Sequence, residues 1–138
     1  MLRSVELIGR KMTDLEIEDV ARKWIVYQEA WERDGGPGRT GSELQWVYNL
    51  VDDMTRDRPE ETWKLILAVR RLDQSEMIEQ ILAAAVFEDL MSAYGATLID
   101  RVEAEAKRDP SFVGVIRASY RIGMSEDVWG RLQAFLKQ

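Results

Sequence analysis

Apolar residues recur every three or four positions along most of the chain, and this spacing predicts a series of amphipathic helices. We expect the first helix to start at Thr13, because Thr13 and Glu16 have the spacing of a capping box. Residues 1–12 form a short mixed segment whose structure the pattern leaves uncertain. The apolar face of the first helix comprises Ile17, Val20, Ala21, Trp24, Tyr27 and Trp31.

Residues 34–42 are predicted to form a glycine-rich interhelical loop, because glycine supplies backbone freedom and ends helices. Gly36, Gly41 and Ser42 come close to the spacing of a phosphate-binding loop. The Lys that such a loop needs before Ser42 is absent, and a helix precedes the segment where a strand is required. A flexible connection between two helices is therefore the favoured interpretation.

The rest of the chain continues the helical pattern, with Pro59 suited to a helix start, Gly95 to a stop and Ser125 to a cap. The further helices are expected over residues 42–56, 59–72, 75–94, 96–108 and 111–120, and from Ser125 to the end. No segment shows the sustained alternation that strands require. The sequence therefore predicts an all-α fold: a compact bundle of six or seven helices with antiparallel helical hairpins, in one domain over residues 1–138.

Three segments resemble a family of small uncharacterised bacterial all-α proteins. They are Arg58–Trp63, Val86–Met91 and Ile99–Glu105, which are similar to Pro-Glu-x-x-Trp, Leu-Glu-Asp-Leu-Leu and Ile-Asp-x-Ile-Glu segments of those proteins. The resemblance covers residues 44–137. It implies a bacterial origin and an all-α domain, and it transfers no catalytic residue, because that family has no assigned function.

His and Cys are absent from all 138 residues, and this absence excludes several classes of chemistry. Disulfides, thiolate nucleophiles and the common zinc and haem ligand sets cannot form without them. Ser-His-Asp, Cys-His and Glu-x-x-His sites are excluded for the same reason. We therefore expect no catalytic residue, no cofactor, no metal ion and no enzymatic activity.

The charge balance bears on the class of partner. The chain carries 19 basic and 25 acidic residues, a net charge of −6, which argues against nucleic acid. Residues 73–110 hold nine acidic and three basic residues, so their net charge equals that of the whole chain. Because no apolar run reaches the ~18 residues needed to span a bilayer and the start lacks the apolar region of a signal peptide, we expect a cytoplasmic protein without membrane contact.

Two groups of residues are candidates for a partner-binding surface. Trp31 and Trp46 flank the glycine-rich segment, and tryptophan is enriched at binding hot spots. The acidic segment contributes four candidate carboxylates, which are Glu76, Glu79, Asp100 and Glu103. The simpler explanations are that tryptophans pack in the core, as expected for Trp24, Trp63 and Trp129, and that surface carboxylates are solvated or paired with arginine.

A non-enzymatic protein-binding domain is the function that these observations favour. One concrete form is a bacterial immunity protein or antitoxin that binds a basic toxin protein, in keeping with a small acidic protein without catalytic signatures. One alternative is the structural subunit of a homo-oligomer. Another is a metal-binding enzyme that works through carboxylates such as Asp100 and Glu103, which lie three residues apart on one predicted helix face.

Overall fold

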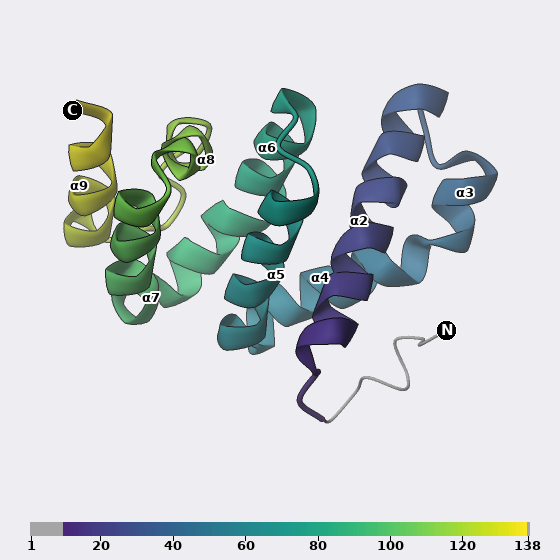
Figure 1. The fold of residues 1–138 in the computed structure, drawn as a ribbon, viewed down its shortest axis with the longest axis horizontal. Helices are drawn as coiled ribbons and strands as arrows, with labels where there is room; N and C mark the ends of the chain where they lie inside the picture. Colours follow the sequence, from purple (N-terminus) through teal and green to yellow (C-terminus); the bar gives the residue numbers. More distant parts are fainter. Residues whose placement is uncertain (1–9, 138) are drawn as a thin grey trace. The chain divides into compact units, whose positions relative to one another are not determined.

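The computed structural model describes residues 10–137, and every regular element in this range is helical (Figure 1). The all-α fold class is therefore confirmed. Of the uncertain N-terminal segment 1–12, residues 1–9 lie outside the described range. Where the sequence predicts one domain, the chain divides into two compact units, Met1–Ile78 and Glu79–Gln138, and each is described by itself.

The first unit is built on its long N-terminal helix. This helix, α2 (Asp14–Asp34), packs most extensively against α5 (Pro59–Leu72) and also contacts α3 (Gly38–Glu43) and α4 (Gln45–Asp57). Its contacts with three helices explain why its apolar positions are buried over nearly its whole length. Trp24 and Trp63 are 1% and 6% exposed, which confirms that both are core residues.

Local signals place the helix ends of this unit. The Thr13 hydroxyl accepts the Glu16 backbone N–H at 3.2 Å, and the Glu16 carboxylate accepts the Thr13 N–H at 2.9 Å, so the predicted capping box is confirmed. Gly35 adopts a left-handed conformation with φ +66° and ends α2. Pro59 occupies the start of α5, also as predicted.

The prediction of a glycine-rich loop over residues 34–42 is corrected by the structure. Only the turn at residues 35–37 is irregular, and Gly38–Glu43 form the short helix α3. Helix α4 then begins at Gln45. Within α3, a Cβ at the buried Gly41 would lie 3.1 Å from the Pro37 side chain, so glycine allows a close approach at this position.

The second unit contains most of a long run of helix. A π-helical turn, Ala83–Phe87, separates α6 (Glu76–Leu82) from α7 (Glu88–Arg108), and η2 (Pro110–Phe112), α8 (Val113–Arg117), α9 (Glu126–Ala134) and η3 (Phe135–Lys137) follow. The π-turn is a local irregularity that widens the helix. In the core, the Phe87 and Phe112 rings meet edge to face with centroids 5.9 Å apart.

The helix break predicted at Gly95 is confirmed in position. Tyr94 has non-helical φ and ψ of −130° and 17°, and two helical stretches meet there across a kink within α7. Gly95 is buried, and a Cβ there would lie 2.9 Å from a Val128 methyl group. This glycine therefore serves the close approach of α9 to α7. The predicted Ser125 cap of α9 is confirmed, because its hydroxyl accepts the Val128 N–H at 3.1 Å.

Residues Glu76–Arg108 make a helix that is long and apolar enough to cross a membrane by length and composition. Half of its apolar window is buried inside the protein. Core helices of soluble proteins meet the same criteria, so this stretch is weak evidence for a membrane span. The expected cytoplasmic location and lack of membrane contact stay predictions.

Candidate functional site

A pocket of about 420 Å³ opens on the surface of the first unit, lined by five uncharged residues. We call it the aromatic pocket; its lining residues are Tyr27, Gln28, Trp31, Gln45 and Tyr48. Three come from the C-terminal half of α2 and two from the N-terminal half of α4. The pocket therefore depends on the turn and the short helix α3 that join these two helices.

Three rings form a continuous aromatic group in this pocket. The Tyr27 ring centroid lies 6.3 Å from that of Trp31 and 5.5 Å from that of Tyr48, both in tilted arrangements. Tyr27 is only 4% exposed, whereas Trp31 and Tyr48 are 40% and 42% exposed. The buried ring thus supports two aromatic side chains that remain available to solvent.

Hydrogen bonds fix one side of the pocket. The Tyr27 hydroxyl donates to Gln45 Oε1 at 3.2 Å, and Gln45 Nε2 donates to Asn49 Oδ1 at 3.3 Å. This chain sets the amide orientation of Gln45 and holds the ring of Tyr27 against α4. The pocket is preorganised, because Trp31 and Tyr48 are already exposed without any movement of the Tyr27 ring.

Gln28 supplies a polar group at the wall of the pocket. The residue is 9% exposed, and within residues 10–137 its amide makes no hydrogen bond. Its amide atoms are not among the buried polar atoms that lack a partner, so they reach solvent in the pocket. A ligand there can replace that water with a direct hydrogen bond to Gln28.

The two tryptophans predicted to flank a recognition loop have different surroundings. Trp31 lines the aromatic pocket, and its ring also contacts α3 at Gly41. Trp46 is half-buried and is not a lining residue; the Lys23 ammonium lies 5.7 Å from its ring centroid, a cation–π distance. Lys23 in turn pairs with Asp19 at 2.5 Å. Trp46 is thus occupied by a cation of its own chain.

The acidic candidates of the second unit are largely engaged. Arg131 on α9 donates to Asp100 at 2.6 Å and to Glu103 at 3.0 Å. Hydrogen bonding to this arginine lowers the pKa of Glu103, more than burial raises it. The same contacts raise the pKa of Arg131, first through Glu103 and then through Asp100. Two of the four predicted carboxylates therefore share one arginine, which offsets one of their two negative charges.

The other two carboxylates lie on α6. Glu76 is exposed, and the half-buried Glu79 carboxylate lies over Gly114, where any Cβ would collide with it. In the second unit, Glu88 is 3% exposed and accepts the Tyr120 backbone N–H at 3.2 Å. Within residues 10–137, no three acidic side chains gather into a group that could hold a metal ion.

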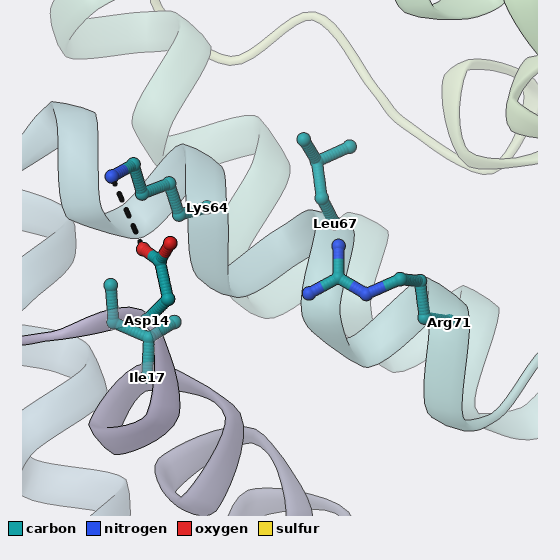
Figure 2. Close-up of a pocket in the computed structure, with 5 residues that line it drawn as sticks. All are labelled: Asp14, Ile17, Lys64, Leu67 and Arg71. Carbon is teal, nitrogen blue, oxygen red and sulfur yellow. Dashed lines mark hydrogen bonds and ion pairs between the residues drawn. The ribbon is translucent and has the colours of Figure 1, made fainter.

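A smaller depression of about 170 Å³ lies between α2 and α5 (Figure 2). Lys64 reaches across to Asp14 at 3.3 Å, which partly neutralises both groups. Arg71 lies two turns further along α5, with Leu67 between the two cations. Because both partners of this ion pair are exposed, the pair contributes little to stability at this depression.

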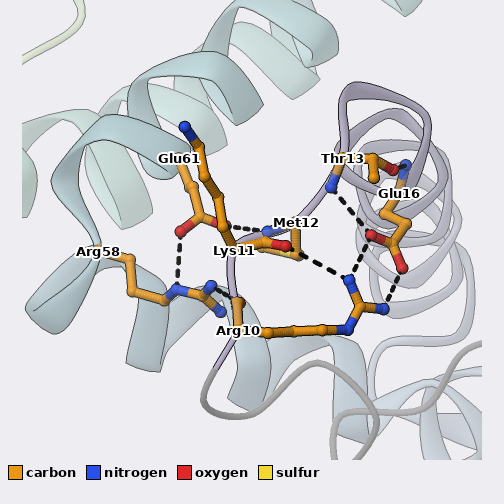
Figure 3. Close-up of polar contacts among 7 residues, drawn as sticks. All are labelled: Arg10, Lys11, Met12, Thr13, Glu16, Arg58 and Glu61. Carbon is orange, nitrogen blue, oxygen red and sulfur yellow. Dashed lines mark hydrogen bonds and ion pairs between the residues drawn. The ribbon is translucent and has the colours of Figure 1, made fainter.

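A polar cluster connects residues 10–12 to the start of α5 (Figure 3). It includes Arg58 and Glu61 of the Arg58–Trp63 segment. Buried Glu61 accepts the Met12 backbone N–H at 2.8 Å and pairs with Arg58 at 2.9 Å. Hydrogen bonds, first from Arg10 and then from the Thr13 backbone, lower the pKa of Glu16 to about 2. These side chains anchor the chain and leave no oriented group free for chemistry.

The sequence pattern did not reveal the whole pocket. Tyr27 lies on the predicted apolar face of the first helix, and Tyr48 lies in the helix predicted over residues 42–56. The surface that the two rings share is visible only with α2 and α4 placed together. Gln28 gave one usable signal, because it is an amide between the aromatic residues at positions 27 and 31 on the same helix. Glutamine at the edge of an apolar stripe is common, so the signal was weak.

Fold and site together define a small all-α domain with a preformed aromatic pocket. The model of a family of unknown function, DUF6869, matches residues 35–138, and the chain belongs to this family. The predicted membership of an uncharacterised family is thereby confirmed. The match includes α4 and its side of the pocket and begins after α2. No curated protein and no solved structure matches the chain.

Proposed function

We propose that this protein is a non-enzymatic protein-binding domain whose docking site is the aromatic pocket. The observation that carries the proposal is the exposure of Trp31 and Tyr48 over the buried ring of Tyr27. Rigid aromatic side chains supply large contact areas at low entropic cost and dominate protein interfaces. A concrete form of the proposal is an immunity protein or antitoxin that binds a basic toxin protein.

The acidic segment supports docking less well than the pocket. Arg131 already pairs with Asp100 and Glu103, and the buried Glu88 accepts a backbone N–H from Tyr120. A partner that used Asp100 or Glu103 would compete with Arg131 for these carboxylates. The net charge of −6 instead acts over distance and speeds the encounter with a basic partner.

Affinity capture with variants of the tagged protein tests the proposal. Wild type, Trp31→Ala and Tyr48→Ala are used to capture proteins from a lysate of the source organism. A partner of the pocket is recovered by wild type and reduced at least about tenfold by either substitution, the loss typical of a hot spot.

Tyr120→Ala is the matched control, because Tyr120 is an aromatic residue of the second unit with 73% exposure. It should leave capture unchanged. A partner that is lost with Tyr120→Ala and kept with Tyr48→Ala would contradict the proposal. Sedimentation at several concentrations tests the alternative of a homo-oligomer, in which the captured protein is a second copy of this chain.

A further inference from the structure

We infer that the aromatic pocket recognises a cationic side chain of the partner, with the guanidinium of an arginine as the best fit. This inference rests on the proposed function and specifies the chemistry of the same site. It follows from the rings, from the solvent-facing amide of Gln28, which makes no hydrogen bond within the described residues, and from the absence of charge among the lining residues.

The rings provide the attraction. The faces of tryptophan and tyrosine carry negative electrostatic potential and attract ammonium and guanidinium groups within about 6 Å. Trp46 shows this chemistry within the same unit, because Lys23 lies 5.7 Å from its centroid. In the described part of the chain, no cation lies over Trp31 or Tyr48. These two rings are therefore free to take a cation from outside.

Gln28 provides the directional contact. Its carbonyl oxygen can accept from a guanidinium N–H, and a guanidinium can stack on one ring while donating in its own plane. The ammonium of lysine is a point charge that stays more strongly hydrated, so it gains less from the rings. Arginine therefore satisfies both the aromatic group and the Gln28 amide.

Charge complementarity favours the same occupant. The five lining residues are uncharged, so nothing in the pocket repels a cation, and the chain as a whole carries −6. A carboxylate ligand would meet three aromatic ring faces and no cation among the lining residues. An aliphatic side chain would fill the space and leave the Gln28 amide unpaired.

A titration with two small probes tests the inference. N-acetyl-arginine amide and its neutral analogue N-acetyl-citrulline amide are added to full-length protein labelled with ¹⁵N. The readout is the indole N–H resonance of Trp31, assigned by its loss in Trp31→Phe. The arginine probe should give a saturable shift in the millimolar range. The citrulline probe should bind more weakly by between about twofold and about thirtyfold, the range that cation–π contacts span.

Variants separate the pocket from general attraction to an acidic protein. Tyr48→Ala and Gln28→Leu should each weaken the arginine probe several-fold, while Tyr120→Ala should not change its affinity. Equal binding of the two probes, or no saturable shift with arginine, would overturn the inference. Neither result touches the capture experiment, so a docking pocket without cation selectivity remains distinguishable from a failed docking site.

Discussion

The aromatic pocket and the acidic α6–α7 segment are both predicted recognition surfaces, and the structure treats them differently. In the pocket, two large rings remain about 40% exposed and one amide has no partner among the described residues. The side chains of the pocket can still contact a partner. In the acidic segment, Asp100 and Glu103 already bind Arg131 of their own unit.

The difference shows why a charge count along the chain overstates a patch. Residues 73–110 carry the whole net charge, but Arg131, which pairs with two of their carboxylates and offsets one of those charges, lies outside that range. Among the described residues, no cation lies over the rings of Trp31 and Tyr48. The availability of these rings depends on how neighbouring helices pack, and Trp31 remains 40% exposed beside α3.

The largest expected effect separates two tryptophans of the same helix. Trp24→Ala should lower the free energy of unfolding by about 3–5 kcal/mol, because it empties a fully buried site. Trp31→Ala should lower it less, by about 1–2 kcal/mol, because 40% of Trp31 remains exposed in the folded protein. Urea denaturation followed by circular dichroism measures both, and Trp24→Leu provides a readable curve if the alanine variant does not fold. Similar losses at the two positions would show that Trp31 is a core residue.

A smaller loss is expected at Glu88 in the acidic segment. Glu88→Ala leaves the Tyr120 backbone N–H without its acceptor and should cost about 1–3 kcal/mol of unfolding free energy. The neighbouring exposed Asp89→Ala is the control and should change stability by about 0.5 kcal/mol or less. Equal losses would mean that Glu88 does not act as a buried structural acceptor.

The smallest effect concerns the pKa of Glu103. Arg131→Ala removes the hydrogen bonds that lower this pKa, so it should rise toward the ordinary value of about 4.3. Because the folded pKa is lowered, the pair stabilises the protein above pH ~4.3, and this stabilisation is lost as the pH falls below it. Carboxyl resonances followed by NMR over an acid titration measure the shift. Arg117→Ala, another exposed arginine of this unit, should leave the pKa of Glu103 unchanged; an unchanged pKa in Arg131→Ala would contradict the pairing.

Helix starts could be predicted from the sequence because caps are local. Thr13, Pro59 and Ser125 act within one turn of their helices, and all three are confirmed. The sequence also predicts a helix break at Gly95, and the helical geometry does break beside it, at Tyr94. The sequence does not show that Gly95 also admits a neighbouring helix, because that role depends on the Val128 side chain of α9.

The candidate site could be predicted only in part for the same reason. Trp31 was identified from its place beside the glycine-rich segment, and it does line the pocket. Trp46 was named on equal grounds and is instead covered by Lys23, a contact that spans 23 residues of sequence. A pairing between distant residues also determines which carboxylates of the acidic segment are engaged, because Arg131 lies 28 residues from Glu103.

Calorimetric titration of the purified partner against three forms of the protein compares the two surfaces most directly. These forms are wild type, Tyr48→Ala, and a double variant that carries Asp100→Asn and Glu103→Gln. If the aromatic pocket is the docking site, Tyr48→Ala raises the Kd at least about tenfold and the double variant changes it by about twofold or less. An unchanged Kd for Tyr48→Ala, together with a tenfold or larger loss for the double variant, would place docking on the acidic segment and contradict the proposal.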